Sequence, residues 1–571
     1  MKIIRQLLAV LLLLFFVIAC NQETKKSDNA TNSDSKVQEM RLTELKQSER
    51  PPPPPKQETS VDYSQISIVP DYEVVKTNKD GDGVTDELEK PLENKNEFNT
   101  EDYDNIIENK FLTATKNPLS TFSIDVDEAA YSNVRRYLEN GSLPPAGAVR
   151  IEEMINYFDY VYPKPENGEP FTVNTEISDC PWNNQHRLVH IGLQGKEIPV
   201  DNLPPSNMVF LIDVSGSMNE SNKLPLVQAS LNMLVDQLRE KDKVAIVVYA
   251  GNAGLVLPST NGINKIKIKE AINDLEAGGS TAGGEGIQLA YKVAKDNFIK
   301  EGNNRIILAT DGDFNVGVSS DDELVRLIEN ERKAGVFLSV LGYGMGNYKD
   351  NKMQQLADKG NGNHSYIDNI NEAKKVLVNE FGSTLFTIAK DVKIQIEFNP
   401  SKVQAYRLIG YENRMLAAED FNDDTKDAGE LGSGHTVTAL YEIIPVGVKD
   451  SFIKSVDPLK YQYNNGEIAD EESPEIMTIK LRYKEPIGEV SKLINHPVID
   501  SHLKLVNTSD NFRFSAAVAE FGLLLRDSEY RQQSSFSQVA SLAQSASGKD
   551  ENGYRSEFVR LVGSATSFAK K

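Results

Sequence analysis

Apolar residues follow two different patterns along this chain, and the first occupies residues 206–387. Short apolar runs typical of buried strands alternate there with stretches whose apolar residues recur at helical spacing, such as Leu224, Val227 and Leu231. The patterns predict strands at 208–213, 243–250, 254–257, 304–309, 336–342 and 364–367, and helices near 224–239, 265–275, 284–299, 321–333, 350–358 and 371–386. This order predicts an α/β fold, a doubly wound and mostly parallel sheet with helices on both faces.

The second pattern, an alternation of apolar and polar residues, flanks the first on both sides and is typical of strands. It predicts strands at 171–177 and 187–193 before the α/β region, and at 392–398, 404–409, 435–444 and 476–483 after it. We expect these strands to pair with one another, so that the α/β domain is inserted in, or flanked by, a β-sandwich-like domain. Beyond them Phe514, Val518, Phe521 and Leu525 share one helical face, which predicts C-terminal helices.

Composition and pattern together divide the 571 residues into segments, because a chain of this length exceeds a single core. The stretch from Gln22 to about Gln65 lacks apolar periodicity and contains the prolines Pro51–Pro55, so it is predicted to be a stiff, unfolded tether. The predicted segments are an export signal at 1–20, the disordered tether at 21–100, a helical region at 101–165, strands at 166–205, the α/β domain at 206–387, a β domain at 388–505 and a helical region at 506–571.

Oxygen-bearing side chains follow two of the predicted buried strands. Asp213, Ser215 and Ser217 come where the strand 208–213 ends, and Asp311 follows another. Ligands of open α/β sheets bind in the crevice beyond the carboxyl ends of the strands, so this position favours function over packing. Carboxylate and hydroxyl oxygens suit Mg²⁺, with Mn²⁺ or Ca²⁺ as alternatives, and no His or Cys lies nearby in the sequence to attract zinc or copper.

These residues resemble a known motif. The pattern D-x-S-x-S, then Thr281 in a glycine-rich turn, then T-D-G after an apolar strand is similar to the metal-ion-dependent adhesion site of von Willebrand factor type A domains. The resemblance implies a Rossmann-like domain in which Ser215, Ser217 and Thr281 coordinate Mg²⁺ directly or nearly so. It also implies that Asp213 and Asp311 hold the ion mostly through bound waters. Because Mg²⁺ takes six oxygens and dehydrates reluctantly, a position is left for an acidic group from a partner protein.

Longer stretches resemble a bacterial family of von Willebrand factor type A lipoproteins. N-P-L-S-T-F-S-I-D-V-D at 117–127 with V-R-x-E-E-M-I-N-Y-F at 149–158 is similar to the region that precedes the A domain in that family. Y-R-L-I-G-Y-E-N-R at 406–414 and N-F-R-F-S-A-A-V-A-E-F at 511–521 resemble its C-terminal domain, which has no assigned activity. The resemblance extends over about residues 115–565.

The N-terminus is predicted to be an export signal. Basic residues precede an apolar run that is too short to span a bilayer as a permanent helix and ends at Cys20. Residues 17–20 resemble a bacterial lipobox, which implies lipid on the Cys20 sulfur, and the alternative is an ordinary signal peptide. Asn21 after the cysteine favours the outer membrane by resemblance. We therefore expect a lipid-anchored protein of the cell envelope, in which the remaining cysteine, Cys180, is a buried thiol.

A candidate calcium loop lies in the tether at 78–89. Asn78, Asp80, Asp82 and Glu89 occupy positions 1, 3, 5 and 12 of such a loop. No convincing helix leads into it and a proline follows closely. An acidic turn in a linker is therefore the favoured interpretation, and Ca²⁺ binding is the alternative.

Two more acidic residues, Asp125 and Asp127, lie at the start of a helix predicted at 127–138. Both are candidate metal ligands. An aspartate at this position more commonly accepts hydrogen bonds from the first free N–H groups of the helix. We therefore predict that Asp127 caps this helix.

Charge and missing motifs argue against several classes of function. The formal net charge of −22 argues against nucleic acid as a partner. Neither G-x-x-x-x-G-K-[ST] nor G-x-G-x-x-G occurs, so we expect no nucleotide, and neither Ser215 nor Ser217 stands in a G-x-S-x-G elbow. We expect a non-enzymatic envelope protein that binds a partner protein through the Mg²⁺-dependent site. The alternatives are a metal-independent scaffold or assembly factor of the envelope and, third, a hydrolase.

Overall fold

The computed structural model describes residues 100–166, 168–251, 253–279, 283–312, 321–380, 386–426, 428–453, 472–486 and 488–569. The chain divides into two compact units, Met1–Leu92 and Glu93–Lys571, and all of the described residues belong to the second unit. The predicted signal peptide, Cys20, the tether and the candidate calcium loop at 78–89 lie outside the described residues. Over the part of the chain that is described, no helix combines the length and the hydropathy needed to cross a bilayer.

A six-stranded sheet forms the centre of the α/β domain, in the order β10-β9-β8-β5-β6-β7. Neighbouring strands are parallel, except that β7 runs antiparallel to β6. The strands are β5 (Ser206–Asp213), β6 (Lys243–Tyr249), β7 (Ala253–Asn261), β8 (Asn303–Thr310), β9 (Val336–Tyr343) and β10 (His364–Ile367). This arrangement confirms the predicted fold class.

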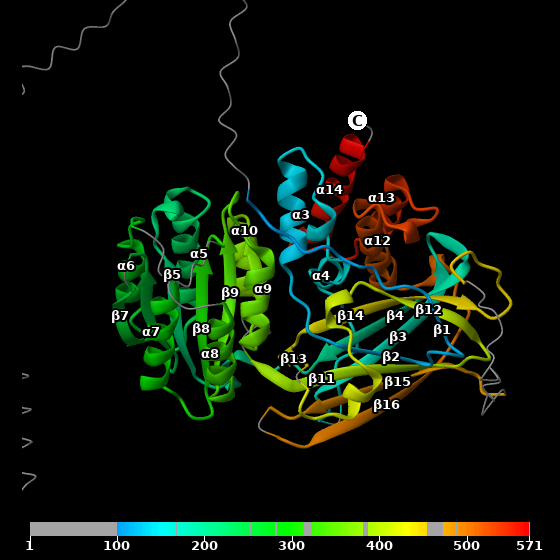
Figure 1. Ribbon diagram of the computed structural model, residues 1–571, viewed down its shortest axis with the longest axis horizontal. Helices are drawn as coiled ribbons and strands as arrows, with labels where there is room; N and C mark the ends of the chain where they lie inside the picture. Colours follow the sequence, from blue (N-terminus) through cyan, green and yellow to red (C-terminus); the bar gives the residue numbers. More distant parts are fainter. Residues whose placement is uncertain are drawn as a thin grey trace, which may run out of the picture. The chain divides into compact units, whose positions relative to one another are not determined.

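Helices cover both faces of this sheet (Figure 1). Met208, Phe210 and Ile212 of β5 pack with α5 (Leu224–Gln237), α6 (Lys265–Asn273) and α10 (Ile370–Lys374). Val209 and Leu211 pack on the other face with α7 (Gly283–Asp296), α8 (Asp321–Lys333) and α9 (Asp350–Lys359). Because both faces are covered, every residue of β5 is buried, which explains its unbroken apolar run.

The β-sandwich consists of two mainly antiparallel sheets. The first has the order β1-β12-β14-β4-β3, and the second has the order β13-β11-β15-β16 with β2 also paired to β11. Their strands are β1 (Leu112–Thr113), β2 (Leu119–Ser123), β3 (Phe171–Cys180), β4 (Asn183–Gly195), β11 (Thr387–Phe398), β12 (Val403–Ile409), β13 (Gly429–Gly432), β14 (Thr436–Pro445), β15 (Glu475–Lys484) and β16 (Ser491–Ile499).

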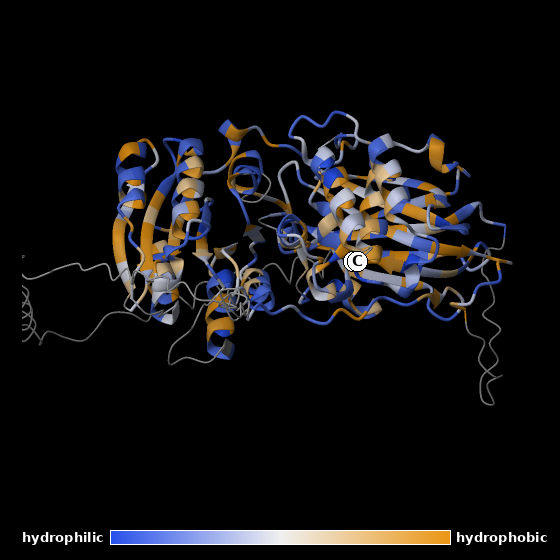
Figure 2. Cartoon of the chain, turned by 90° about the horizontal axis from the view of Figure 1, so that it is seen from above, coloured by the Kyte–Doolittle hydropathy of each residue, from blue (hydrophilic) through white to orange (hydrophobic). Residues whose placement is uncertain are grey.

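The pairing of β4 with β14 joins the parts of the chain that precede and follow the α/β domain, with Val189 opposite Tyr441. Ile191 of β4 and Ile394 of β11 belong to the same apolar core, so the two sheets face each other. The α/β domain is therefore inserted between β4 and β11, as the alternating pattern predicted. Figure 2 shows the hydrophobic residues concentrated on the strands of both parts.

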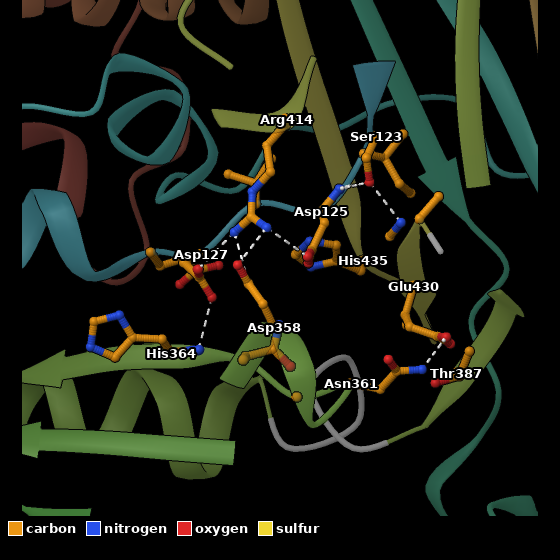
Figure 3. A pocket seen from close by; sticks show the side chains of 18 of the residues that line it. Ser123, Asp125, Asp127, Asp358, Asn361, His364, Thr387, Arg414, Glu430 and His435 are labelled. Carbon is orange, nitrogen blue, oxygen red and sulfur yellow. Dashed lines mark hydrogen bonds and ion pairs between the residues drawn. The ribbon is translucent and has the colours of Figure 1, made fainter. Parts of the chain in front are cut away.

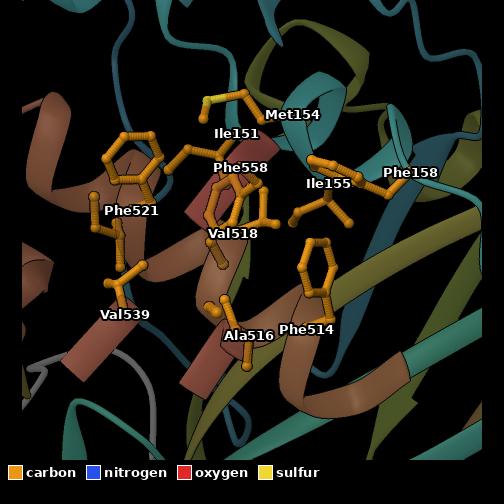
Figure 4. Close-up of a cluster of buried hydrophobic side chains, with 14 of the residues drawn as sticks. Ile151, Met154, Ile155, Phe158, Phe514, Ala516, Val518, Phe521, Val539 and Phe558 are labelled. Atoms are coloured by element: carbon orange, nitrogen blue, oxygen red, sulfur yellow. The ribbon is translucent and has the colours of Figure 1, made fainter. Parts of the chain in front are cut away.

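Helices from the two ends of the described chain share a third apolar core, which lies against the first sheet of the sandwich (Figure 4). Ile151 and Phe158 contribute from the N-terminal side, and Phe514, Phe521 and Phe558 contribute from the C-terminal side. The helices are α3 (Ala129–Glu139), α4 (Ile151–Asn156), α12 (Asp510–Leu525), α13 (Phe536–Ser545) and α14 (Tyr554–Ala569). The predicted C-terminal helices are thus confirmed. Cys180 is a buried free thiol beside this core.

The predicted capping role of Asp127 is wrong. The residue before α3 is Glu128, and its side chain makes no capping hydrogen bond. The Asp127 carboxylate instead accepts the backbone N–H of His364 at 2.8 Å and pairs with Arg414 at 3.1 Å. Contacts from distant parts of the chain explain the difference, because the Arg414 guanidinium and the His364 N–H already engage this buried carboxylate.

Candidate metal site

The carboxyl end of β5 lies at a topological switch point of the α/β sheet. The chain pairs β5 with β6 on one side and with β8 on the other, and at such a point open α/β sheets form their ligand-binding crevice beyond the strand end. Asp213 is the last residue of β5 and is fully buried. Its Oδ1 accepts the backbone N–H of Ser215 at 2.9 Å, an Asx turn that directs the following loop back over the strand end.

The two predicted serine ligands lie side by side in this loop. The Oγ atoms of Ser215 and Ser217 are 3.0 Å apart. Ser215 is almost completely buried and Ser217 is exposed, so one hydroxyl lies inside the crevice and the other lies at its mouth. Thr310, at the end of the adjacent β8, donates to Oδ2 of Asp213 at 3.3 Å and fixes the orientation of that carboxylate.

Asp311 enters the crevice from the end of β8. It is fully buried, and Ser217 and Asn347 donate hydrogen bonds to its carboxylate. Gly312 follows with φ +97°, where a Cβ atom would lie 2.8 Å from the Lys349 nitrogen, so only glycine allows the turn. The structure therefore brings the side chains of the two loops together.

The surroundings of the two carboxyl groups shift their pKa values in opposite directions. Burial, assisted by the negative charge of Asp311, raises the pKa of Asp213 to about 6 although Ser215 donates to it. Burial also acts to raise the pKa of Asp311, but the hydrogen bonds from Asn347 and Ser217 and the ammonium of Lys223 lower it below its usual value.

Lys223 is a component of the site that the sequence did not reveal. It directly precedes α5, is only 4% exposed and places its Nζ 3.1 Å from Oδ2 of Asp311. The apolar spacing of the helix gives no reason to bury its ammonium, so no sequence signal marks it. Thr310 was missed as well, since its position in the sequence is simply that of the last residue of a strand.

Thr281 lies outside the described residues, but the described turn before it contacts the loop that contains Ser215 and Ser217. The Gly216 N–H donates to the carbonyl of Gly279 at 3.0 Å, and the Gly278 N–H donates to the carbonyl of Val214 at 2.7 Å. Of the predicted ligands, the structure brings together Asp213, Ser215, Ser217 and Asp311.

The donor set fits a hard divalent cation. Two buried carboxylates and two hydroxyls provide oxygen ligands only, the set that Mg²⁺, Mn²⁺ and Ca²⁺ prefer. Within the described ranges, no cluster of three or more His, Cys, Asp or Glu side chains is placed to hold a metal ion. A cation at this site must therefore use the serine hydroxyls as well as the carboxylates.

Three family models match the chain. The model described as von Willebrand factor type A domain matches residues 207–379, the one described as von Willebrand factor matches 97–190, and the one described as uncharacterized protein YfbK, C-terminal, matches 383–568.

Individual relatives agree with these models. The uncharacterized protein YfbK of Escherichia coli (strain K12) is 45% identical over 468 residues, which cover 81% of this chain and 80% of that protein. Inter-alpha-trypsin inhibitor heavy chain H3 of Homo sapiens is 26% identical over 209 residues, which cover 34% of this chain and 23% of that protein. Among solved structures, a von Willebrand factor type A protein from Catenulispora acidiphila is 15% identical and covers 68% of this chain and 90% of its own, with a TM-score of 0.36.

Proposed function

The chain belongs to the family of von Willebrand factor type A proteins that includes YfbK of Escherichia coli, and from this premise we propose that it binds a partner protein through a divalent cation. A domain of this type suggests protein–protein interaction, often metal-dependent. The proposed cation is Mg²⁺. The residues proposed to hold it are Asp213, Ser215, Ser217, Thr281 and Asp311.

The meeting of two strand ends carries this proposal. Asp213 and Asp311 come from neighbouring strands, are both buried and interact closely enough for one charge to raise the pKa of the other. Carboxylates held together without water are unfavourable unless a cation or proton lies between them. Lys223 offsets the charge of Asp311, and a divalent cation would offset the charges of both carboxylates.

The chain's own residues orient the site before any partner arrives. Ser215 N–H and Thr310 hold the Asp213 carboxylate, and Ser217 holds that of Asp311. When bound, the cation supplies a Lewis-acidic position for a carboxylate of the partner protein. Ser217 stands at the mouth of the crevice, so the incoming group meets the exposed side of the site.

Two alternative functions, a scaffold and a hydrolase, would use this domain differently. A metal-independent scaffold or assembly factor would use the surface of the domain and leave the crevice without a role. A hydrolase would require a base beside a serine. The carboxylates beside Ser215 and Ser217 are those of Asp213 and Asp311, which we propose hold the cation instead of accepting a proton from a serine. We therefore propose binding and not catalysis.

We also propose that lipid on Cys20 anchors the protein to the cell envelope, most simply at the outer membrane. The support is the resemblance of residues 17–20 to a lipobox. The acidic partner protein would then be another envelope component.

Partner capture with and without metal tests the proposed function. Detergent extracts of the envelope are passed over immobilised protein in Mg²⁺ or in EDTA, and the captured proteins are identified by mass spectrometry. The Ser217→Ala variant removes a proposed ligand, and Ser221→Ala is the matched control because Ser221 is an exposed serine a few residues further along the same loop.

We expect wild type and S221A to retain the same partner in Mg²⁺ and to release it in EDTA, and we expect S217A to retain none in either buffer. Equal capture in EDTA and Mg²⁺ by all three proteins would support the scaffold and overturn the metal-dependent mode. Circular dichroism of each variant shows whether loss of capture reflects loss of folding.

A further inference from the structure

A second buried site lies where the α/β domain meets the β-sandwich. A cavity of about 290 Å³ lies there (Figure 3). It is lined by residues 123–128, from the last residue of β2 to the residue before α3, by residues 358–365 at the end of α9 and the start of β10, and by parts of 413–432 from the sandwich. Arg305, near the start of β8, also lines it. Asp311 follows the other end of the same strand, roughly 20 Å away at 3.3 Å per residue. The cavity is therefore separate from the metal site.

Acidic residues are common along this cavity, and one arginine contacts three of them. Arg414 pairs through Nη1 with Asp125 at 3.0 Å and with Asp358 at 2.8 Å, and through Nη2 with Asp127 at 3.1 Å (Figure 3). Burial and the charge of Asp358 raise the pKa of Asp127 well above its usual value, so a proton on Asp127 and the guanidinium of Arg414 together offset part of this negative charge.

The other carboxylates that line the cavity are also engaged. Lys375, fully buried, pairs with both Glu128 and Glu380. Glu430 accepts a hydrogen bond from the side-chain amide of Asn361 at 3.0 Å. The acidic part of the wall is thus satisfied by groups of the chain itself.

Arg305 differs from these groups, because it is a buried cation without an acidic partner among the described residues. It is 2% exposed, and within that part of the chain it forms no ion pair within 4 Å. Nη1 donates to Ser339 Oγ at 2.7 Å, the guanidinium lies 5.5 Å from the Phe337 ring, and Nε has no partner in the part of the chain that is described. Burial lowers the pKa of Arg305 to about 10, and the negative charge of Glu430 acts in the opposite direction.

A buried guanidinium without a counterion is unfavourable, since it loses its hydration and gains no ion pair. We propose that the cavity binds a small ligand with a single anionic group, a carboxylate or a phosphate, which pairs with Arg305. A guanidinium recognises both groups through parallel N–H donors. The acidic wall around it favours the ligand of lowest charge, a carboxylate or a singly ionised phosphate. The cavity volume is close to the lower end, roughly 300 Å³, of known small-molecule pockets.

The ligand would connect the two parts of the fold. Arg305 belongs to the α/β domain, whereas Thr387 and Glu430, which also line the cavity, belong to the sandwich. Occupancy would therefore stabilise the junction between them. This role requires neither the metal site nor a partner protein.

Thermal unfolding in the presence of anions tests the proposal. Sodium acetate and sodium phosphate are titrated separately in EDTA, against sodium chloride at equal ionic strength, and affinity is measured by calorimetry. Arg305→Met removes the charge and keeps an apolar stem of similar length. Arg482→Met is the matched control, because Arg482 lies on β15 away from the cavity and pairs with Asp424.

We expect one of the two probes to give the wild type a saturable rise in Tm of about 2 °C over chloride. A response to acetate identifies a carboxylate ligand, and a response to phosphate identifies a phosphate ligand. R482M should respond like the wild type, and R305M should bind at least tenfold more weakly. The proposal is overturned if neither probe exceeds chloride in the wild type, or if R305M responds like the wild type.

Arg305→Lys keeps the experiment decisive should R305M fail to fold. A lysine preserves the charge but loses the fork of donors. We expect its affinity for the active probe to fall at least threefold, and an unchanged affinity would overturn the proposal.

Discussion

Asp213 and Asp311 are buried carboxylates at neighbouring strand ends, and the environment of Asp213 favours its protonated form. The rise of its pKa from 3.8 to about 6 corresponds to about 3 kcal/mol. Between these pH values the folded protein holds a proton on Asp213 that the unfolded chain has already released. The stability of the metal-free protein should therefore fall as the pH rises through this window.

The pH dependence of unfolding checks this directly. In EDTA we expect the wild type to lose about 1–3 kcal/mol relative to Asp213→Asn between pH 4 and pH 6.5. Guanidinium unfolding of both proteins at each pH gives the difference. Added Mg²⁺ should restore the loss at the higher pH, since the cation replaces the proton. A constant difference between the two proteins across the window would contradict the proposed environment of Asp213.

The ammonium of Lys223 repels a cation at the site, because it lies 3.1 Å from Asp311, a proposed ligand. Lys223→Met should increase the affinity for Mn²⁺ about tenfold, which corresponds to about 1.4 kcal/mol of removed repulsion. It should also destabilise the metal-free protein, since Asp311 loses a partner. Calorimetric titration of Mn²⁺ measures the first effect. An affinity that is unchanged or lower in K223M would contradict this role.

Much of the site could be predicted from the sequence, because its donors are short polar residues placed directly after apolar strands. Asp213, Ser215 and Ser217 follow β5, and Asp311 follows β8, so strand prediction alone places them at one edge. Lys223 and Arg305 could not be found in this way. Lys223 depends on which loop covers the carboxyl ends of the strands, and Arg305 depends on which domain covers the start of β8. Local sequence patterns do not contain this information.

At the scale of elements, α12 and α4 pack closely at Gly522. A Cβ atom at this position would lie 2.7 Å from Cγ1 of Ile151. Gly522→Ala should therefore destabilise the fold by about 1–3 kcal/mol, because the helices must separate or Ile151 must change its rotamer. Guanidinium unfolding at neutral pH measures the change.

Gly563 of α14 provides the matched control. It is an exposed helical glycine, and a Cβ atom added there would have no neighbour within 4 Å among the described residues. Gly563→Ala should stabilise the protein by about 0.5–1 kcal/mol through its helix propensity. If both substitutions changed the stability in the same direction, close packing would not be what retains glycine at position 522.

The strands that the sequence pattern did not predict are those that are only partly buried or that pair with a strand far along the chain. β16 lies at the edge of its sheet, with Leu493 and Ile499 more than half exposed, so its apolar alternation does not mark one buried face. β2 joins β11, far along the chain, and its short length gives little periodicity. The predicted cap at Asp127 failed for the same reason, since Arg414 approaches from a remote loop.

At the scale of the whole molecule, segments that are far apart in the sequence pair and pack with one another. Strands β3 and β4 join a sandwich completed after the α/β domain, and helices from both sides share one core. The alternating pattern could predict the first of these, because two strands alone are marginally stable and need further strands to pair with. It could not predict the second, since two amphipathic helical regions contain no information on which of them meet.

Attachment to the membrane is a property of the full chain and depends in our proposal on Cys20. The Cys20→Ser variant should appear in the soluble fraction of disrupted cells, whereas the wild type should sediment with membranes and release into detergent. Cys180→Ser is the control, since Cys180 is a buried free thiol. Sedimentation of C20S with membranes at the wild-type level would contradict a lipid anchor.

The central claim is that oxygen donors from separate loops hold one divalent cation at the end of β5. Anomalous diffraction from crystals grown with Mn²⁺ tests it most directly. We expect a single strong peak within bonding distance of the Ser215 and Ser217 hydroxyls, between Asp213 and Asp311, and we expect it to disappear in S217A crystals. A wild-type crystal in saturating Mn²⁺ with no peak in this crevice would contradict the claim.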